Sequence, residues 1–391
     1  MRAVRHPGEL RWETRLLAVI VATLVVFGII AVYGASSLTI THGERVGWDY
    51  ALTQVTGAAF GGVLLIIASQ IDYYRWRDVA WPLMLLTLVL LLIPVLPFTL
   101  AIAPIKNGSR RWIDIGPASF QVSELARLVV VVWCAMLAAK KGDRVRELRK
   151  GVGPFVMVLG AIFVLVLLQP NLSMATLITM LGGVVLFASG ARIGHFLLLL
   201  MVGAIVGFNA IQGAQYRVAR LVSYLGQGDA EGAYQIKQSI IGFGSGQLFG
   251  VGLGEGQQKL GFLPYAYSDF LFSSIGEEWG FIGVCVIVAL YVTFCWLGFR
   301  IARTTEDPFG RYLAIGLTVT VGLTALMHMA VNLGMMPTTG LTLPFVSFGR
   351  SSLVISLLGA GILINIGRMR GKPRAQARAQ PRAQVREGQA A

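Results

Sequence analysis

Charged residues are scarce in this sequence of 391 residues: 13% are Asp, Glu, Lys or Arg, while 55% are hydrophobic. A soluble domain carries about 25% charged residues, so the composition excludes a soluble globular enzyme and a disordered chain. Long apolar runs such as Leu16–Tyr33 and Leu83–Leu96 lie between short polar joints. The chain is therefore predicted to be a polytopic membrane protein.

Cysteine is also scarce, and Cys134, Cys285 and Cys295 each lie inside an apolar run. An odd, dispersed set excludes a disulfide framework and a cysteine metal cluster. The sequence also lacks a nucleotide-binding Gly-Lys-Ser/Thr loop, a His/Cys metal spacing and a Ser-His-Asp set. The net charge of +14 indicates cytoplasmic loops that face anionic lipid, so we expect a membrane setting and no nucleic-acid partner.

A transmembrane helix needs about 20 mostly apolar residues. We predict an all-α polytopic membrane protein with ten such helices, at 16–35, 51–70, 79–98, 121–139, 152–168, 171–189, 193–213, 270–299, 310–333 and 343–367. The first run is longer than a signal-peptide core, which favours an uncleaved span. The membrane domain covers 16–370 and follows a cytoplasmic segment at 1–15. The basic tail 371–391 is expected to be disordered, with docking on a partner as the alternative.

The distribution of Lys and Arg predicts that both termini are cytoplasmic. In that orientation the inner segments carry 23 basic residues and the outer segments carry 8. Basic residues accumulate on the cytoplasmic side, so the short loop 140–150, with six of them, is decisive. The same orientation places residues 214–268, between the seventh and eighth spans, in a large extracytoplasmic loop.

The loop Ala214–Ser268 has a pattern of its own, and loops of this length are usually functional. Tyr234–Ile241 reads as a short amphipathic helix, and closely spaced glycines follow from Gly242 to Gly256. Such glycines let a backbone approach a ligand closely. A flexible connector is the alternative, but the interleaved apolar residues indicate a loop that packs on the membrane surface.

Ionisable side chains inside spans are costly and mark candidate functional positions. Glu124 and Arg127 share a helix face, which suits either a self-neutralising pair or a contact from Arg127 to an anionic substrate. Asp269, Ser273 and Glu277 would form one polar stripe that opens to the outer surface if the eighth span were continuous.

Motifs along nearly the whole chain resemble one family. They are Asn107–Gly116 with Gln121–Glu124, Gln169–Asn171, Gly232–Gln235, Gly250–Gly254, Gln258–Leu260, Asp269–Phe270, Gly276–Glu278, Asn332, Gly340–Pro344 and Ser347–Gly349. In this order they are similar to blocks of the SEDS family (FtsW, RodA and SpoVE). The run Gly-Leu-Thr-Leu-Pro makes the chain look most like FtsW, the cell-division member.

The resemblance implies a peptidoglycan glycosyltransferase in the bacterial cytoplasmic membrane. Such an enzyme polymerises lipid II into undecaprenyl-diphosphate-linked glycan on the outer face. It works with a class B penicillin-binding protein, a transpeptidase, and with other divisome proteins. Two other functions stay open, a carrier that moves lipid II across the membrane and a non-catalytic divisome scaffold. The apolar centres of spans one, three, five and six favour the enzyme.

Several residues depart from the family pattern. Asn171 stands where Asp is usual, and Tyr265 and Tyr267 stand where Glu and His are frequent. Arg127 replaces a common Lys and keeps its charge, while Arg350 replaces a glycine. A mechanism that needs a second acid or base beside Asp269 is therefore not supported by this sequence.

The implied reaction requires a general base for the acceptor hydroxyl and cations for the leaving diphosphate. Asp269 is the predicted catalytic base. The predicted contacts to the substrate and its diphosphate are Lys259, Arg217, Arg220, Arg111 and Arg127, and the predicted supporting polar residues are Glu124, Glu277, Gln258 and Ser347. A divalent cation, Mg or Mn, held in part by Asp269 could replace or join the cations, and no residue cluster decides this.

Overall fold

The computed structural model describes residues 11–37, 40–41, 44–45, 47–106, 108–116, 118–196, 201, 203, 212, 218 and 231–369. Within these residues, eight helices are long and apolar enough to cross a membrane, and a further apolar helix, α6 (Leu172–Ala188), is shorter. The predicted all-α, multi-pass architecture is confirmed. The predicted seventh span, 193–213, lies mostly outside the described residues, as does the tail 371–391.

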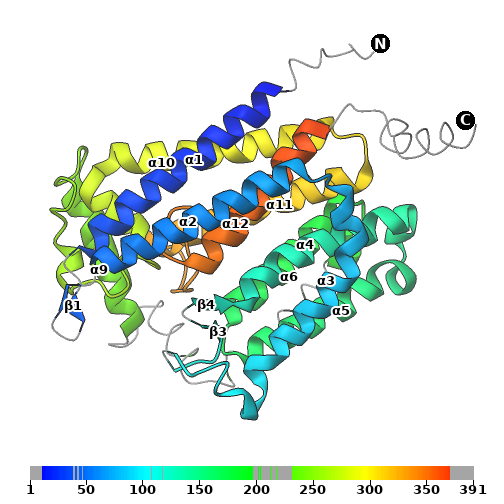
Figure 1. The fold of residues 1–391 in the computed structure, drawn as a ribbon, viewed down its shortest axis with the longest axis horizontal. Coiled ribbons are helices and arrows are strands. Elements are labelled where there is room, and N and C mark those ends of the chain that lie inside the picture. Colours follow the sequence, from blue (N-terminus) through cyan, green and yellow to red (C-terminus); the bar gives the residue numbers. More distant parts are fainter. Residues whose placement is uncertain are drawn as a thin grey trace, which may run out of the picture.

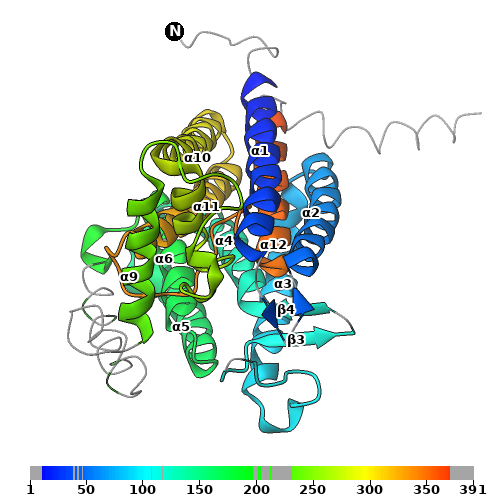
Figure 2. The ribbon, with the colours of Figure 1, turned by 90° about the vertical axis from the view of Figure 1, so that its left-hand side faces the viewer.

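The helices of the bundle lie side by side in Figure 1. Besides α6 they are α1 (Arg11–Ser36), α2 (Gly47–Gln70), α3 (Tyr74–Leu92), α4 (Val122–Lys141), α5 (Gly153–Leu168), α10 (Leu271–Thr304), α11 (Pro308–Asn332) and α12 (Arg350–Met369). The predicted amphipathic helix is present as the longer α9 (Glu231–Gly246), which packs beside α10 (Figure 2).

Short elements connect these helices. They are two antiparallel hairpins, β1 (Ile40–Thr41) with β2 (Glu44–Arg45) and β3 (Trp112–Ile115) with β4 (Ala118–Gln121), and the single turns η1 (Ile93–Val95), η2 (Pro97–Thr99), η3 (Gly142–Arg146), η4 (Leu148–Val152) and η5 (Gln258–Leu260). The hairpin β3–β4 leads directly into α4.

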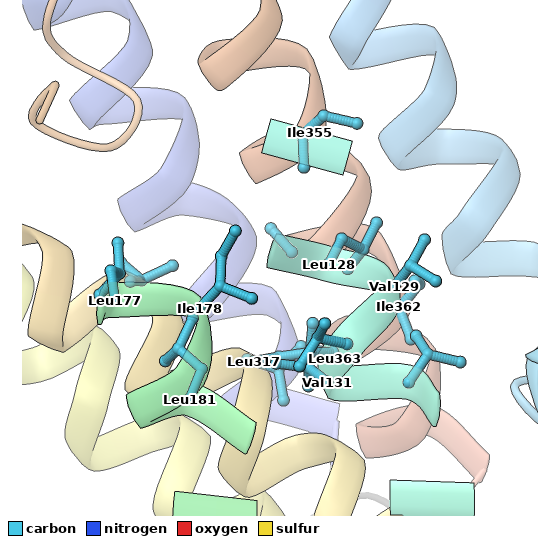
Figure 3. Close-up of a cluster of buried hydrophobic side chains, with 14 of the residues drawn as sticks. Leu128, Val129, Val131, Leu177, Ile178, Leu181, Leu317, Ile355, Ile362 and Leu363 are labelled. Atoms are coloured by element: carbon cyan, nitrogen blue, oxygen red, sulfur yellow. The ribbon is translucent and has the colours of Figure 1, made fainter. Parts of the chain in front are cut away.

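Helices α4 and α12 occupy the centre of the bundle. In an apolar stretch of 18 residues within each span, 89% of the residues of α4 and 83% of those of α12 are buried, compared with 28% in α2. Figure 3 shows the apolar cluster where α4, α6, α11 and α12 meet: Leu128, Val129, Val131, Leu177, Ile178, Leu181, Leu317, Ile355, Ile362 and Leu363. Side chains from four helices thus fill this part of the interior.

Small residues bring α2 and α12 together, as is common where membrane helices pack closely. A Cβ atom added at Gly61 would lie 2.6 Å from Leu357 Cδ1, and one added at Gly361 would lie 2.5 Å from the carbonyl oxygen of Leu65. The paired positions advance in the same direction along both helices, so α2 and α12 run parallel. A Cβ atom added at Gly57 would lie 3.2 Å from Arg350 Cγ, so the first turn of α12 packs against the middle of α2.

The predicted last span starts too early, because α12 begins at Arg350 and residues 343–349 are not helical. Proline disfavours the helical region in the residue before it, and Phe345 has a left-handed backbone (φ 69°). Contacts with two other helices hold this segment: Tyr291 donates to the carbonyl of Pro344, and His328 Nδ1 lies 2.7 Å from the carbonyl of Leu341. The chain therefore enters the bundle as an irregular loop before α12 starts.

Helix α10 is broken at Gly280, whose backbone (φ 65°, ψ −167°) is not helical. The glycine-rich segment 246–252 supplies hydrogen bonds at the break. The N–H groups of Val251 and Gly252 donate to the carbonyls of Glu277 and Glu278 (3.0 and 3.3 Å), and those of Phe281 and Ile282 donate to Gln247 and Leu248 (2.9 and 3.2 Å). Backbone groups freed inside a membrane span must be paired in this way.

The glycine spacing predicts a close approach of the backbone to a ligand, whereas Gly250 lies against the backbone of α10. Gly250 has a left-handed conformation (φ 82°), and a Cβ atom there would overlap the carbonyl of Glu278. A Cβ atom at Gly280 would likewise overlap the N–H of Gly250. These two glycines allow the backbones of the loop and of α10 to pack directly against each other.

Candidate active site

Asp269 is partly exposed and lies one residue before Phe270, the N-cap of α10. Its N–H donates to the carbonyl of Tyr265 (3.1 Å), and Asn332 Nδ2 donates to its carbonyl oxygen (3.0 Å). A Cβ atom added at Gly340 would lie 3.7 Å from Asp269 Oδ2. The loop before α10, the end of α11 and the segment before α12 therefore meet around this acid.

Tyr265 forms a tight turn in front of Asp269. Its carbonyl oxygen accepts hydrogen bonds from the N–H groups of Ser268, Asp269 and Phe270, at 3.0, 3.1 and 3.3 Å. The backbone of Tyr265 is left-handed (φ 58°), which costs a residue other than glycine on the order of 1–3 kcal/mol. Such strain is characteristic of functional sites, because the surrounding contacts must enforce it.

An aromatic cluster covers one side of this turn. The rings of Tyr50 and Tyr267 lie 4.4 Å apart, and both contact Phe348, at 5.0 and 5.6 Å between centroids. The hydroxyls of Tyr267 and Tyr50 are hydrogen bonded at 3.2 Å. Burial, followed by this hydrogen bond, raises the pKa of Tyr267 well above its ordinary value. Tyr267 is therefore protonated at neutral pH and does not act there as a second base.

Lys259 is buried and saturated with acceptors. Its Nζ lies 3.1 Å from Glu278 Oε1 and donates to the carbonyl oxygens of Gly34 (3.1 Å) and Gly254. An ammonium group has three donors, so these three acceptors use all of them. The predicted contact from Lys259 to a diphosphate stays a prediction, and in this conformation the side chain joins the loop to α1 and α10.

Glu277 holds the same loop through its backbone. Its Oε1 accepts from the N–H groups of Gln257 (2.8 Å) and Gln258 (3.3 Å), and Ser245 Oγ lies 3.5 Å away. The predicted polar stripe is wrong in one respect: Ser273 and Glu277 are buried rather than open to a surface. Ser273 donates to the carbonyl of Ser239, so α9 covers this face of α10.

Arg127 and Glu124 form a buried ion pair, with Nη2 of Arg127 2.9 Å from Oε2 of Glu124. The guanidinium also contacts Thr324 Oγ1 (3.4 Å) and Ser356 Oγ (3.2 Å). It lines a cavity of about 20 Å³ together with Thr320, which is room for one water molecule. The pair is neutralised inside the bundle, and a contact of Arg127 with substrate stays a prediction.

The other predicted residues lie at different places. Arg111 donates to the carbonyl oxygens of Gln169 (3.0 Å) and Pro170 and so holds the turn between α5 and α6. The carbonyl of buried Ser347 accepts from Gln54 Nε2 at 3.1 Å. Arg217 and Arg220 lie outside the described residues.

The structure thus gathers Asp269, Lys259, Gln258 and Glu277 on one loop and its partner helix, whereas the Arg127–Glu124 pair and Arg111 lie elsewhere. The part that sequence reasoning missed is Asn332, which appeared only as one letter of a motif. A signal was present, because an amide at the end of an apolar span requires buried partners.

A bound metal ion needs several protein ligands that lie close together. Within the described ranges, no group of three or more His, Cys, Asp or Glu side chains could hold one. A divalent cation at Asp269 stays a prediction.

These features define a multi-pass membrane protein with one partly exposed, tightly held acid where a loop enters the bundle. The family FTSW_RODA_SPOVE, described as "Cell cycle protein", matches residues 14–372. The chain therefore belongs to the FtsW/RodA/SpoVE family, which confirms the resemblance read from its motifs.

Relatives match over almost their full length. The chain is 36% identical over 366 residues to a protein of Geobacter metallireducens named "Probable peptidoglycan glycosyltransferase FtsW", covering 93% of this chain and 96% of the relative. The fold is similar to a chain in a solved peptidoglycan synthase complex, with a TM-score of 0.73, 26% identity and coverage of 91% and 98%. Thermus thermophilus RodA gives a TM-score of 0.67, 26% identity and coverage of 91% and 97%.

Proposed function

We propose that this protein is a peptidoglycan glycosyltransferase that polymerises lipid II into glycan strands. The observation that carries the proposal is Asp269, a partly exposed acid whose peptide group is held on both sides. The full-length similarity to a relative named for this activity supports it.

In the proposed reaction a hydroxyl of one sugar attacks the anomeric carbon of another. A C–O bond forms, the bond from that carbon to the diphosphate breaks, and the bonding electrons leave with the diphosphate. Asp269 accepts the proton of the attacking hydroxyl, as a general base must. Direct displacement inverts the anomeric centre and needs a single base, which fits one acid beside a protonated Tyr267.

Cations must stabilise the leaving diphosphate. Lys259, Arg111 and Arg127 engage protein acceptors in this structure, and Arg217 and Arg220 lie outside the described residues, so all five stay predicted contacts to the diphosphate. The apolar centres of spans one, three, five and six argue against a lipid carrier, because a transport path needs polar groups through the depth of the bundle.

The proposed setting is the bacterial cytoplasmic membrane, with Asp269 on the outer side and both termini in the cytoplasm. The charge distribution, 23 basic residues against 8, supports this orientation. Labelling of a cysteine placed at Gly142 by an impermeant reagent in intact cells would overturn it. We further propose a class B penicillin-binding protein as the partner and a role in cell division, since the chain resembles an FtsW protein over nearly its full length.

Asp269→Asn tests the catalytic assignment, because asparagine keeps the size of the side chain but cannot take the proton. Asp49→Asn is the matched control, since Asp49 is an exposed acid in the first turn of α2. With purified lipid II and the co-purified transpeptidase, we expect the Asp269 variant to fold, bind its partner and make no polymer. The Asp49 variant should polymerise at the parental rate. Near-parental polymerisation by Asp269→Asn would remove Asp269 from the mechanism.

A further inference from the structure

Asn332 is the last residue of α11 and is fully buried. Both donors of its amide are used: Nδ2 donates to the carbonyl oxygens of Asp269 (3.0 Å) and His328 (2.8 Å). Its Oδ1 accepts from the N–H of Ser273 at 3.0 Å. One side chain therefore joins the carbonyl of the predicted base to two helices.

The contact with Ser273 fixes the start of α10. The first N–H groups of a helix lack partners within it, and the N-cap Phe270 provides no side-chain acceptor. The N–H of Ser273 reaches the carbonyl of Phe270 (3.0 Å) and the amide oxygen of Asn332 (3.0 Å). Asn332 therefore acts on the first turn of α10 from a neighbouring helix.

A third helix completes the arrangement. Ser239 of α9 donates to the backbone carbonyl of Asn332 (2.7 Å), and Ser273 donates in turn to the carbonyl of Ser239 (2.8 Å). The middle of α9, the first turn of α10 and the last residue of α11 are thus held together next to Asp269. An unpaired buried amide costs about 1–3 kcal/mol per group, so this network has one favoured geometry.

We propose that Asn332 is a positioning residue for Asp269, an inference that rests on the proposed function. The N–H of Asp269 is held by Tyr265 and its carbonyl by Asn332, so the backbone that aims the carboxylate is fixed on both sides. Loss of the amide frees the carbonyl side and lets the carboxylate move. A displacement of about 1 Å at a reacting group can lower the rate about 100-fold.

The chain offers a matched control in Asn365 of α12, another buried asparagine. Its Oδ1 accepts from the N–H of Tyr73 (2.9 Å) and its Nδ2 donates to the carbonyl of Ser69 (3.0 Å). It bridges backbone groups as Asn332 does, but it joins α12 to the turn between α2 and α3. Asn332→Ala and Asn365→Ala should therefore lower thermal stability by similar amounts.

The experiment measures kcat and KM for lipid II polymerisation well below the melting temperature of each variant. We expect Asn332→Ala to lower kcat about 10- to 100-fold with KM within twofold, and Asn365→Ala to keep kcat within twofold. If Asn332→Ala does not fold, Asn332→Ser, which keeps one donor, replaces it. Its kcat relative to the parent is then compared with that of Asn365→Ser. Equal kcat values for the paired variants would overturn the inference.

The outcome is separable from the test of the catalytic base. If Asp269→Asn is inactive while Asn332→Ala retains parental kcat, the positioning role alone is wrong. If Asp269→Asn polymerises normally, the catalytic assignment fails, and a loss at Asn332 then has another origin.

Discussion

Replacement of Lys259 by methionine would leave Glu278 without its cation inside the protein. The two side chains are 2% and 4% exposed, and their charged atoms lie 3.1 Å apart. Removal of one partner from a buried pair costs about 3–5 kcal/mol, because the remaining charge stays desolvated. At about 2–4 °C per kcal/mol, the melting temperature should fall by about 10 °C.

Lys106→Met is the matched control for this variant. Lys106 pairs with Asp114 at 2.6 Å, but the side chains are 37% and 30% exposed. An exposed pair contributes about 0–1 kcal/mol, so the control should melt within about 3 °C of the parent. The assay is thermal unfolding of the purified protein in detergent. If the melting temperatures of both lysine variants fall by the same small amount, the argument from the buried ion pair is refuted.

The double variant Lys259→Met/Glu278→Met separates two roles of Lys259. Replacing both members of a buried pair by apolar residues is often neutral or stabilising, so we expect most of the lost stability to return. If Lys259 only joins the loop to the bundle, polymerisation should return with stability. A stable double variant that makes no polymer would instead support the predicted contact of Lys259 with the diphosphate.

Three further outcomes are expected. Gly280→Ala should prevent folding, because its Cβ atom would overlap the loop backbone. Gly160→Ala has open space around the added Cβ atom and should express and melt like the parent. Equal melting temperatures for the two variants would contradict this. Hydrogen bonds from Lys106, then from Ser119, lower the pKa of Asp114. The stabilisation of the β3–β4 hairpin is therefore full above the ordinary value near 4 and is lost as pH falls through the lowered pKa. Amide hydrogen exchange in the hairpin should differ between Asp114→Asn and the parent at pH 5, and this difference should be smaller at pH 3. A difference of the same size at both pH values would contradict the role of the Asp114 carboxylate. Arg350→Gly should leave polymerisation largely intact, and complete loss of product in a folded variant would show that Arg350 has become essential.

Hydropathy was sufficient to predict most of the helices. α2 to α6 lie close to the predicted ranges because their apolar runs end at polar joints. The start of α12 and the break in α10 could not be predicted, because both depend on partners distant in sequence. Pro344 is held by Tyr291, and Gly280 faces Gly250.

The candidate site shows the same division. The motif around Asp269 indicated the acid, and the three-residue spacing of Glu124 and Arg127 indicated their ion pair. The charge of Lys259 suggested a phosphate contact, because a sequence does not reveal that Glu278 lies 3.1 Å away. Asn332 carried a weaker signal: an amide at the end of an apolar span requires buried partners, but the sequence does not reveal that these are backbone groups of Asp269, Ser273 and His328.

The break in α10 also bears on how the chain assembles. A helix with unpaired backbone groups at membrane depth is incomplete by itself, and the segment that completes it, 246–252, lies shortly before it in the chain. That segment is synthesised before α10, and closure of a short loop costs little entropy. The loop and the helix are therefore expected to enter the membrane as one folding unit, so a deletion within 246–252 should impair the insertion of α10 itself.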